Sequence, residues 1–110
     1  MNEIDFARVS EETLSRLNRA LDTVAEDHEV EILYQSGVLT LEFEEPAPSK
    51  IVISPNSPVR QIWISAQATS FKLDWNEERQ AFVFGATGET LNSLVARLIG
   101  EELGVGSITL

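Results

Sequence analysis

The side chains with the most evident chemistry in this sequence are carboxylates gathered near its start. Of its 18 Asp and Glu residues, 12 fall within positions 1–45, where only 3 of the 8 Lys and Arg residues accompany them. Carboxylate oxygens suit hard cations such as Mg²⁺, Ca²⁺ or iron, and a negative surface attracts basic protein surfaces. The same charge repels phosphate backbones and anionic membranes, so we expect no nucleic acid or membrane partner.

Other kinds of chemistry find little support. Cysteine is absent and His28 is the only histidine, which excludes thiolate nucleophiles, cysteine-ligated zinc and a histidine-rich metal site. The Glu-x-x-His motif of di-iron bundles is missing, because Ala25 stands three residues before His28. A two-carboxylate hydrolase stays open on residue counts alone, but the acids fall on convex surface rather than in an evident cleft. We therefore expect a binding protein and not an enzyme.

Two helices and a set of short strands must position these carboxylates. Apolar residues recur at helical spacing over 4–25 and again from Leu91 to Leu103, with Glu89 in the first turn of the second helix and Gly104 as its end. Between them a period of two predicts strands near 29–35, 38–44, 50–54, 61–66, 71–75 and 80–84. We predict a single α+β domain over 1–110, a two-layer sandwich with both helices on one face of an antiparallel sheet of five to six strands.

The first two predicted strands bring acids together. A two-residue turn at Ser36-Gly37 aligns apolar residues on one face and pairs Glu31 with Glu42 and Glu29 with Glu44 on the other. Like charges at ~5 Å destabilise a sheet by a few tenths of a kcal/mol for each pair. This face is either a solvated acidic surface or a site for a cation or a basic partner.

The first helix extends this acidity. Glu11 and Asp22 differ by about 20° around the helix axis but lie ~16 Å apart along it, so they form a ridge and not one chelate. Glu26 and Asp27 continue the ridge into the first strand. Spread carboxylates predict weak binding of hard cations. Arg8, Arg16 and Arg19 interrupt the ridge, and we expect Arg16 to pair with Glu12.

A tryptophan marks the outer face of the predicted sheet. In the strand 61–66, alternation sends Ile62 and Ile64 inward and places Trp63 away from the helices. An exposed tryptophan flanked by polar groups is a candidate interface anchor. The alternatives are that a loop covers Trp63 or that it belongs to the core with Trp75, Phe71 and Leu73. Basic or polar groups at Lys50, Ser54, Arg60 and Lys72 frame this face.

Several motifs together are typical of one family. They are the acidic first helix, Gly37-Val38-Leu39-Thr40-Leu41 after an acidic strand, Pro58-x-Arg60-Gln61-Ile62-Trp63-Ile64-Ser65, Asp74-Trp75 and Gly88-x-Thr90-Leu91. From about Phe6 to Leu103 the chain resembles frataxin in its short bacterial form. The resemblance implies a role in iron–sulfur cluster assembly, with contacts to a cysteine desulfurase and a cluster scaffold protein. It also implies a bacterial cytoplasmic protein that is monomeric without iron.

The resemblance assigns residues to these roles. It implies that Fe²⁺ or Fe³⁺ binds weakly along Glu11, Asp22, Glu26, Asp27, Glu29 and Glu31. Partner contacts are expected at Glu29, Glu31, Glu42 and Glu44 on the acidic side, and at Arg60, Gln61, Trp63 and Lys72 on the sheet face. Asn18 and Arg19 stand where many relatives carry acids, which predicts a lower iron stoichiometry, and Ser54 stands where asparagine is common. The chain ends at Leu110 without the long C-terminal tail of some relatives.

The resulting hypothesis is a non-enzymatic iron donor or regulator of cluster assembly. Two alternatives remain open at this point. One is a ferroxidase that oxidises Fe²⁺ with O₂, against which the lack of a convergent histidine and carboxylate set argues. The other is an acidic adaptor unrelated to iron.

Overall fold

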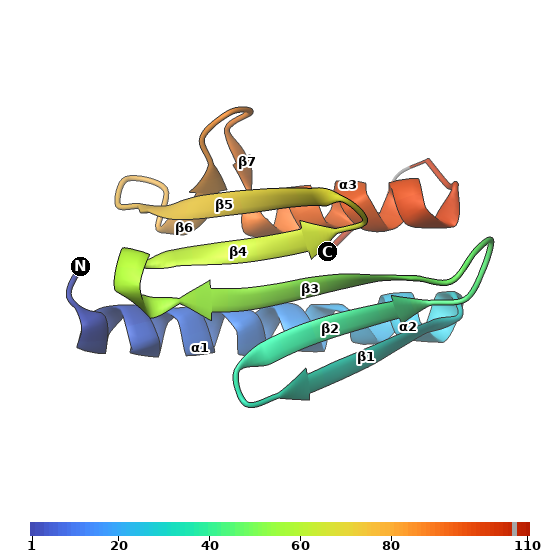
Figure 1. Cartoon of the computed structure of the whole chain (residues 1–110), viewed down its shortest axis with the longest axis horizontal. Helices are drawn as coiled ribbons and strands as arrows, with labels where there is room; N and C mark the ends of the chain where they lie inside the picture. Colours follow the sequence, from blue (N-terminus) through green and yellow to red (C-terminus); the bar gives the residue numbers. More distant parts are fainter. Residues whose placement is uncertain (107) are drawn as a thin grey trace.

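The computed structural model describes residues 1–106 and 108–110 and consists of helices, strands and short turns (Figure 1). The helices are α1 (Glu3–Ala20), α2 (Asp22–Asp27) and α3 (Leu91–Leu103), with a 3₁₀ turn η1 (Ser57–Val59). The strands are β1 (Val30–Gln35), β2 (Val38–Phe43), β3 (Ser49–Asn56), β4 (Gln61–Ala66), β5 (Thr69–Asn76), β6 (Ala81–Phe84) and β7 (Glu89–Thr90). No helix of the described residues is long and apolar enough to cross a membrane.

The strands form one antiparallel sheet in the order β1-β2-β3-β4-β5-β6-β7, and both long helices lie behind it in Figure 1. The predicted two-layer α+β sandwich is therefore confirmed. The sheet has seven strands and not five to six. The additional strand, β7, has only two residues, which is too short for alternation to show in the sequence.

The ends of the helices follow from local chemistry. The Asn2 side chain accepts a hydrogen bond from the Asp5 amide at 2.8 Å, which begins α1. At Leu21 the predicted helix 4–25 divides into α1 and α2. Gly104 ends α3 with a φ of 68°, a conformation that glycine adopts without strain. Thr90 caps the start of α3, so the prediction that Glu89 lies in its first turn is wrong, because Glu89 belongs to β7.

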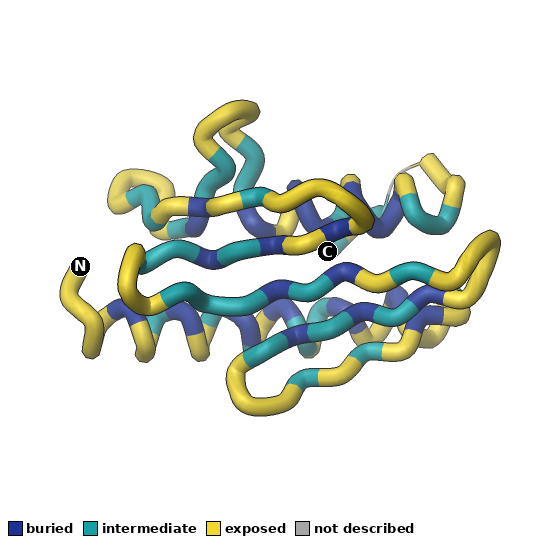
Figure 2. Tube along the Cα trace, in the orientation of Figure 1, coloured by how far each residue is buried: buried dark blue, intermediate teal, exposed yellow. Residues whose placement is uncertain are grey.

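The core lies between the helices and the inner face of the sheet. Figure 2 shows buried positions along the central strands and the inner sides of α1 and α3. Strand residues of one parity, such as Leu39, Leu41, Ile53 and Ile64, are at most 1% exposed. After α3 the chain folds back, and Ile108 and Leu110 pack against this core. Even this short C-terminal segment thus contributes apolar contacts.

Candidate functional site

The β1–β2 hairpin has the predicted register. Ser36 and Gly37 both have positive φ values, 52° and 78°, as a two-residue type I′ turn requires. The turn aligns Tyr34 with Leu39 and Ile32 with Leu41, and it places Glu31 opposite Glu42. The ladder ends at Val30 and Phe43, so Glu29 and Glu44 lie just beyond its last pair.

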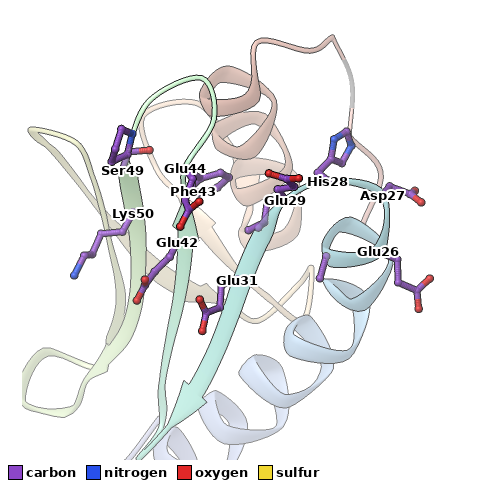
Figure 3. A pocket seen from close by; sticks show the side chains of 13 residues that line it. Glu26, Asp27, His28, Glu29, Glu31, Glu42, Phe43, Glu44, Ser49 and Lys50 are labelled. Atoms are coloured by element: carbon purple, nitrogen blue, oxygen red, sulfur yellow. The ribbon is translucent and has the colours of Figure 1, made fainter.

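Six carboxylates gather where α2 meets this hairpin. We call Glu26, Asp27, Glu29, Glu31, Glu42 and Glu44 the acidic end. Together with His28 and Lys50 they line an open depression of ≈ 940 Å³. Figure 3 shows Glu31 and Glu42 pointing to the same side of the sheet, whereas Glu26 and Asp27 point away from them beyond α2. The carboxylates of the acidic end therefore form two groups that point in different directions, one from the sheet and one from α2.

The other two predicted ridge acids lie outside this depression. Glu11 lines a separate hollow with Arg8, Glu12, Ser15, Arg16 and Arg19. Asp22 is exposed in the first turn of α2. The predicted pair of Arg16 with Glu12 is not formed, since Glu12 lies 3.6 Å from Arg8. In the described chain, ion pairs use Arg8 and Arg97, so no arginine neutralises the acidic end.

The carboxylates do not converge on one point. Within residues 1–106 and 108–110, no three His, Asp or Glu side chains lie close enough to hold one metal ion together. A hard cation needs six or more oxygen ligands when it is held tightly. At this surface, water would have to supply most ligands to a cation, which favours weak and exchangeable binding.

Lys50 is the cation of the acidic end. It lies on β3 directly opposite Glu42, so a row Glu31, Glu42, Lys50 crosses three strands. From the sequence, Lys50 was expected only at the border of the aromatic face. Its position beside Glu42 depends on how β3 pairs with β2 across residues 44–48, and no motif in that segment fixes the pairing.

The second candidate surface surrounds Trp63 on the outer face of the sheet. Ile62 and Ile64 are buried on the helix side, so Trp63 points away from the helices as predicted, and the alternative of a core position is wrong. It is half-buried and not fully exposed. The Lys72 ammonium lies 4.8 Å from the centre of its ring. Trp75 does pack at the core, edge-on against Phe82 at 5.2 Å.

Hydrogen bonds hold Trp63 in place. Its indole N–H donates to the Gln61 side-chain oxygen at 2.9 Å, and the Gln61 amide donates to Asp74 at 3.0 Å. We call Gln61, Trp63, Lys72 and Asp74 the tryptophan cluster. Asp74 was noted in the sequence only as part of the Asp74-Trp75 motif, and the β4–β5 pairing places it opposite Gln61. Arg60 precedes β4 and has a φ of 52°. It is therefore not part of the strand, and the alternation of side chains along β4 does not determine which face it lies on.

A third charged region, on α3, has its charges paired. Arg97 binds both oxygens of Glu89, at 2.9 and 3.0 Å, and also contacts Glu101 at 3.1 Å. The hydrogen bond from Arg97, helped by one from Thr87, lowers the pKa of Glu89 below its ordinary value. The Glu89 hydrogen bond raises the pKa of Arg97 still further above neutrality. Arg97 thus offsets one of the two carboxylate charges here, whereas the hairpin pair Glu31 and Glu42 has no arginine partner in the described chain.

The fold and its surfaces define a class of protein: a two-layer α+β sandwich with an acidic end and a separate aromatic sheet face. The frataxin-like domain family model matches residues 1–105, and the chain belongs to the frataxin-like family. It is 30% identical to the iron-sulfur cluster assembly protein CyaY of Azotobacter vinelandii over 84% of each chain. It is 31% identical to CyaY of Pseudomonas syringae pv. syringae, over 70% of this chain and 68% of that one.

Solved structures of the family share this fold. Frataxin from Psychromonas ingrahamii superposes with a TM-score of 0.82, at 18% identity, over 97% of this chain and 96% of that chain. A trimeric frataxin from Saccharomyces cerevisiae, solved in complex with ferrous iron, gives a TM-score of 0.71 at 20% identity, over 87% and 86% of the two chains. These likenesses establish the architecture of this chain.

Proposed function

We propose that this chain is a non-enzymatic, iron-binding protein of iron–sulfur cluster assembly, which donates iron or regulates the process. Its curated relatives are named as assembly proteins, and a frataxin of the same fold has been solved with ferrous iron. Those relatives are bacterial, and a bacterial cytoplasmic location is part of the proposal.

The observation that carries the proposal is the pairing of Glu31 with Glu42 within a set of six carboxylates that has Lys50 as its cation. The arrangement costs stability, since like charges opposite each other on a sheet repel. A basic partner or a cation removes that repulsion on binding. The repulsion that lowers the stability of the free chain would therefore favour binding of a basic partner or a cation at the acidic end.

We assign the acidic end to the basic surface of a cysteine desulfurase. Glu29, Glu31 and Glu44 are exposed and Glu42 is half-buried, so their charge reaches solvent. Charges of this kind increase the rate and the specificity of association with an oppositely charged partner.

Iron binding belongs to the same surface and its continuation along α1 and α2. Oxygen ligands suit Fe²⁺ and Fe³⁺, and spread carboxylates favour ions that are loosely held and readily passed on. Glu11 and Asp22 are assigned to this continuation, with Glu11 beside arginines that weaken its attraction for a cation. Titration with Fe²⁺ followed by NMR should therefore shift the acidic-end amides more than that of Glu11.

We assign the tryptophan cluster to the cluster scaffold protein. The Trp63 ring is oriented by Gln61 and flanked by Lys72 before any partner arrives, so little side-chain entropy is lost on binding. Arg60, at the start of β4, extends this contact surface. The two proposed partners thus bind different surfaces of the chain.

The experiment that tests the proposal is charge reversal. We expect Glu29→Lys with Glu31→Lys to weaken binding to a purified bacterial cysteine desulfurase by about 100-fold or more, measured by calorimetry. Glu78→Lys, an exposed acid in the β5–β6 turn, is the matched control and should bind normally. Unchanged affinity of the double variant, with a native circular dichroism spectrum, would refute the assignment.

The non-enzymatic part of the proposal has its own measurement. We expect Fe²⁺ oxidation, followed by oxygen consumption at defined iron-to-protein ratios, to proceed no faster with the chain than with iron alone. A rate that rises with protein concentration and falls in the double variant would instead indicate a ferroxidase.

A further inference from the structure

Strand β1 is an edge of the sheet, with β2 as its only strand partner in the described chain. In the Ser36-Gly37 turn the Gln35 carbonyl faces the Val38 amide, so Gln35 and Val38 form a hydrogen-bonded pair. Such pairs alternate along an antiparallel ladder. Glu31, Leu33 and Gln35 therefore bond to β2, and the backbone groups of Ile32 and Tyr34 point outward from the edge.

The inner side chains of β1 are only partly covered by the rest of the fold. Ile32 and Tyr34 face the core side, opposite Leu41 and Leu39, which are both 0% exposed. Ile32 and Tyr34 are nevertheless only half-buried, as the alternating colours of β1 in Figure 2 show. A hollow of ≈ 480 Å³ also opens between Tyr34 and the Ser10–Ser15 part of α1. The backbone and the inner side chains of β1 are therefore accessible from the side.

Two features of β1 select what can pair with it. A strand added beside β1 would place alternate side chains next to Ile32 and Tyr34 on one face, and next to Glu31 and Leu33 on the other. The first row is apolar. The second row begins at the acidic end and includes Leu33, which is 36% exposed. A second copy of this chain would supply no Lys or Arg from β1. Parallel pairing would set Glu31 beside its own equivalent, and antiparallel pairing about Leu33 would set it opposite Gln35, so neither arrangement gives the carboxylate a cation.

We propose that the free edge of β1 accepts an extended segment of a partner protein as an added strand, in which apolar residues alternate with lysine or arginine. Backbone hydrogen bonds to Ile32 and Tyr34 would supply affinity, and the carboxylates would select the basic side chains. This inference rests on the proposed function, because it describes how the acidic end engages its basic protein partner. It adds a backbone component to recognition by charge.

Two peptides of equal charge test the proposal. The first is an acetylated and amidated Lys-Val-Lys-Val-Lys-Val, and the second is Lys-Pro-Lys-Pro-Lys-Pro, which lacks the valine amides and cannot extend a sheet. We expect the valine peptide to bind at least about tenfold more tightly. At saturation it should slow hydrogen exchange of the Ile32 and Tyr34 amides at least about tenfold, with the Leu33 amide, already bonded to β2, little changed.

Equal affinity of the two peptides, or saturation without protection of Ile32 and Tyr34, would overturn the inference. Protection that grows with protein concentration alone would also overturn it, because a second copy would then be the occupant. Glu31→Lys should weaken binding of the valine peptide at least about fivefold, whereas Glu78→Lys should not.

The same exchange measurement with the desulfurase separates this inference from the proposed function. If charge reversal abolishes the complex but Ile32 and Tyr34 stay unprotected within it, the strand pairing fails and the proposed function stands. The opposite result is that the valine peptide protects the Ile32 and Tyr34 amides from exchange while charge reversal leaves desulfurase binding unchanged. The proposed function then fails and the strand pairing stands.

Discussion

The acidic end and the tryptophan cluster lie on the same sheet but are built in opposite ways. In the tryptophan cluster the polar groups satisfy one another, from Asp74 through Gln61 to the indole, with Lys72 beside the ring. In the acidic end carboxylates face each other with Lys50 at one side. The side chains of the first surface are ordered by their own contacts, so we expect it to recognise shape at short range. The second surface has unpaired carboxylates, so we expect it to attract a basic partner at long range.

The largest expected effect tests whether Trp63 belongs to a surface and not to the core. Trp63→Ala should reduce the free energy of unfolding by about 1 kcal/mol, since the ring packs on the outer face of the sheet. Trp75→Ala is the matched comparison and should cost about 3 kcal/mol, because Trp75 packs on Phe82 at the core. Urea unfolding measures both. Equal losses would mean that the two tryptophans have the same role.

Binding should reverse this order. Trp63→Ala is expected to weaken binding to the scaffold protein by about tenfold or more, measured by calorimetry. Trp75→Ala should leave that affinity nearly unchanged in the folded fraction. A scaffold that binds both variants normally would remove the tryptophan cluster from the proposed function.

Salt separates the two surfaces further. Raising the ionic strength from 0.1 M to 1 M shortens the screening length from about 10 Å to about 3 Å. We expect this to weaken binding to the desulfurase at least about tenfold, and binding at the tryptophan cluster by less than about threefold. Affinity series at several salt concentrations check both values. Parallel salt dependence for the two partners would show that both use the acidic end.

The charges around α3 provide a region where a cation is already paired with carboxylates, since Arg97 contacts both Glu89 and Glu101. Arg97→Gln should reduce stability by about 1 kcal/mol at pH 7. The hydrogen bond to Arg97 lowers the pKa of Glu89 in the folded chain. The stability that this pair contributes is therefore fully present above the unfolded carboxyl pKa of about 4.3. It is lost as the pH falls through the lower pKa of the folded chain. The stability difference between the two proteins in urea unfolding should therefore shrink as the pH is lowered below the unfolded carboxyl pKa. Arg16→Gln, at an exposed position on α1, should cost little at either pH.

Much of this comparison could be predicted from the sequence, because burial fixes the alternation. A slip of one residue in β1 would bury glutamates, so the apolar side together with the two-residue turn at Ser36-Gly37 determined that Glu31 faces Glu42. The orientation of Trp63 followed in the same way from Ile62 and Ile64. Both predictions concern residues within one strand or one tight hairpin, where the sequence pattern itself determines the neighbours.

Features that depend on contacts between separate elements could not be predicted. Lys50 meets Glu42 only through the β2–β3 register, and Asp74 meets Gln61 only through the β4–β5 register. Arg97 reaches back from α3 to Glu89, which a helical repeat does not indicate. Glu11 was predicted to form a ridge with Asp22 because the two share nearly the same angle around the helix, but the hollow that Glu11 lines also contains Arg8, Arg16 and Arg19.

The smallest expected effect concerns the cost of the acidic end to the fold. Glu31 faces Glu42 on one side and the open edge of the sheet on the other, so it feels repulsion from β2 with no cation opposite it. Glu31→Gln should therefore raise the free energy of unfolding by a few tenths of a kcal/mol, whereas Lys50→Gln, which removes the cation beside Glu42, should lower it by about as much. Glu31→Gln should at the same time weaken desulfurase binding about threefold. Stability and affinity that fall together in Glu31→Gln would mean that Glu31 supports the hairpin, and the acidic end would then be a structural feature of the fold.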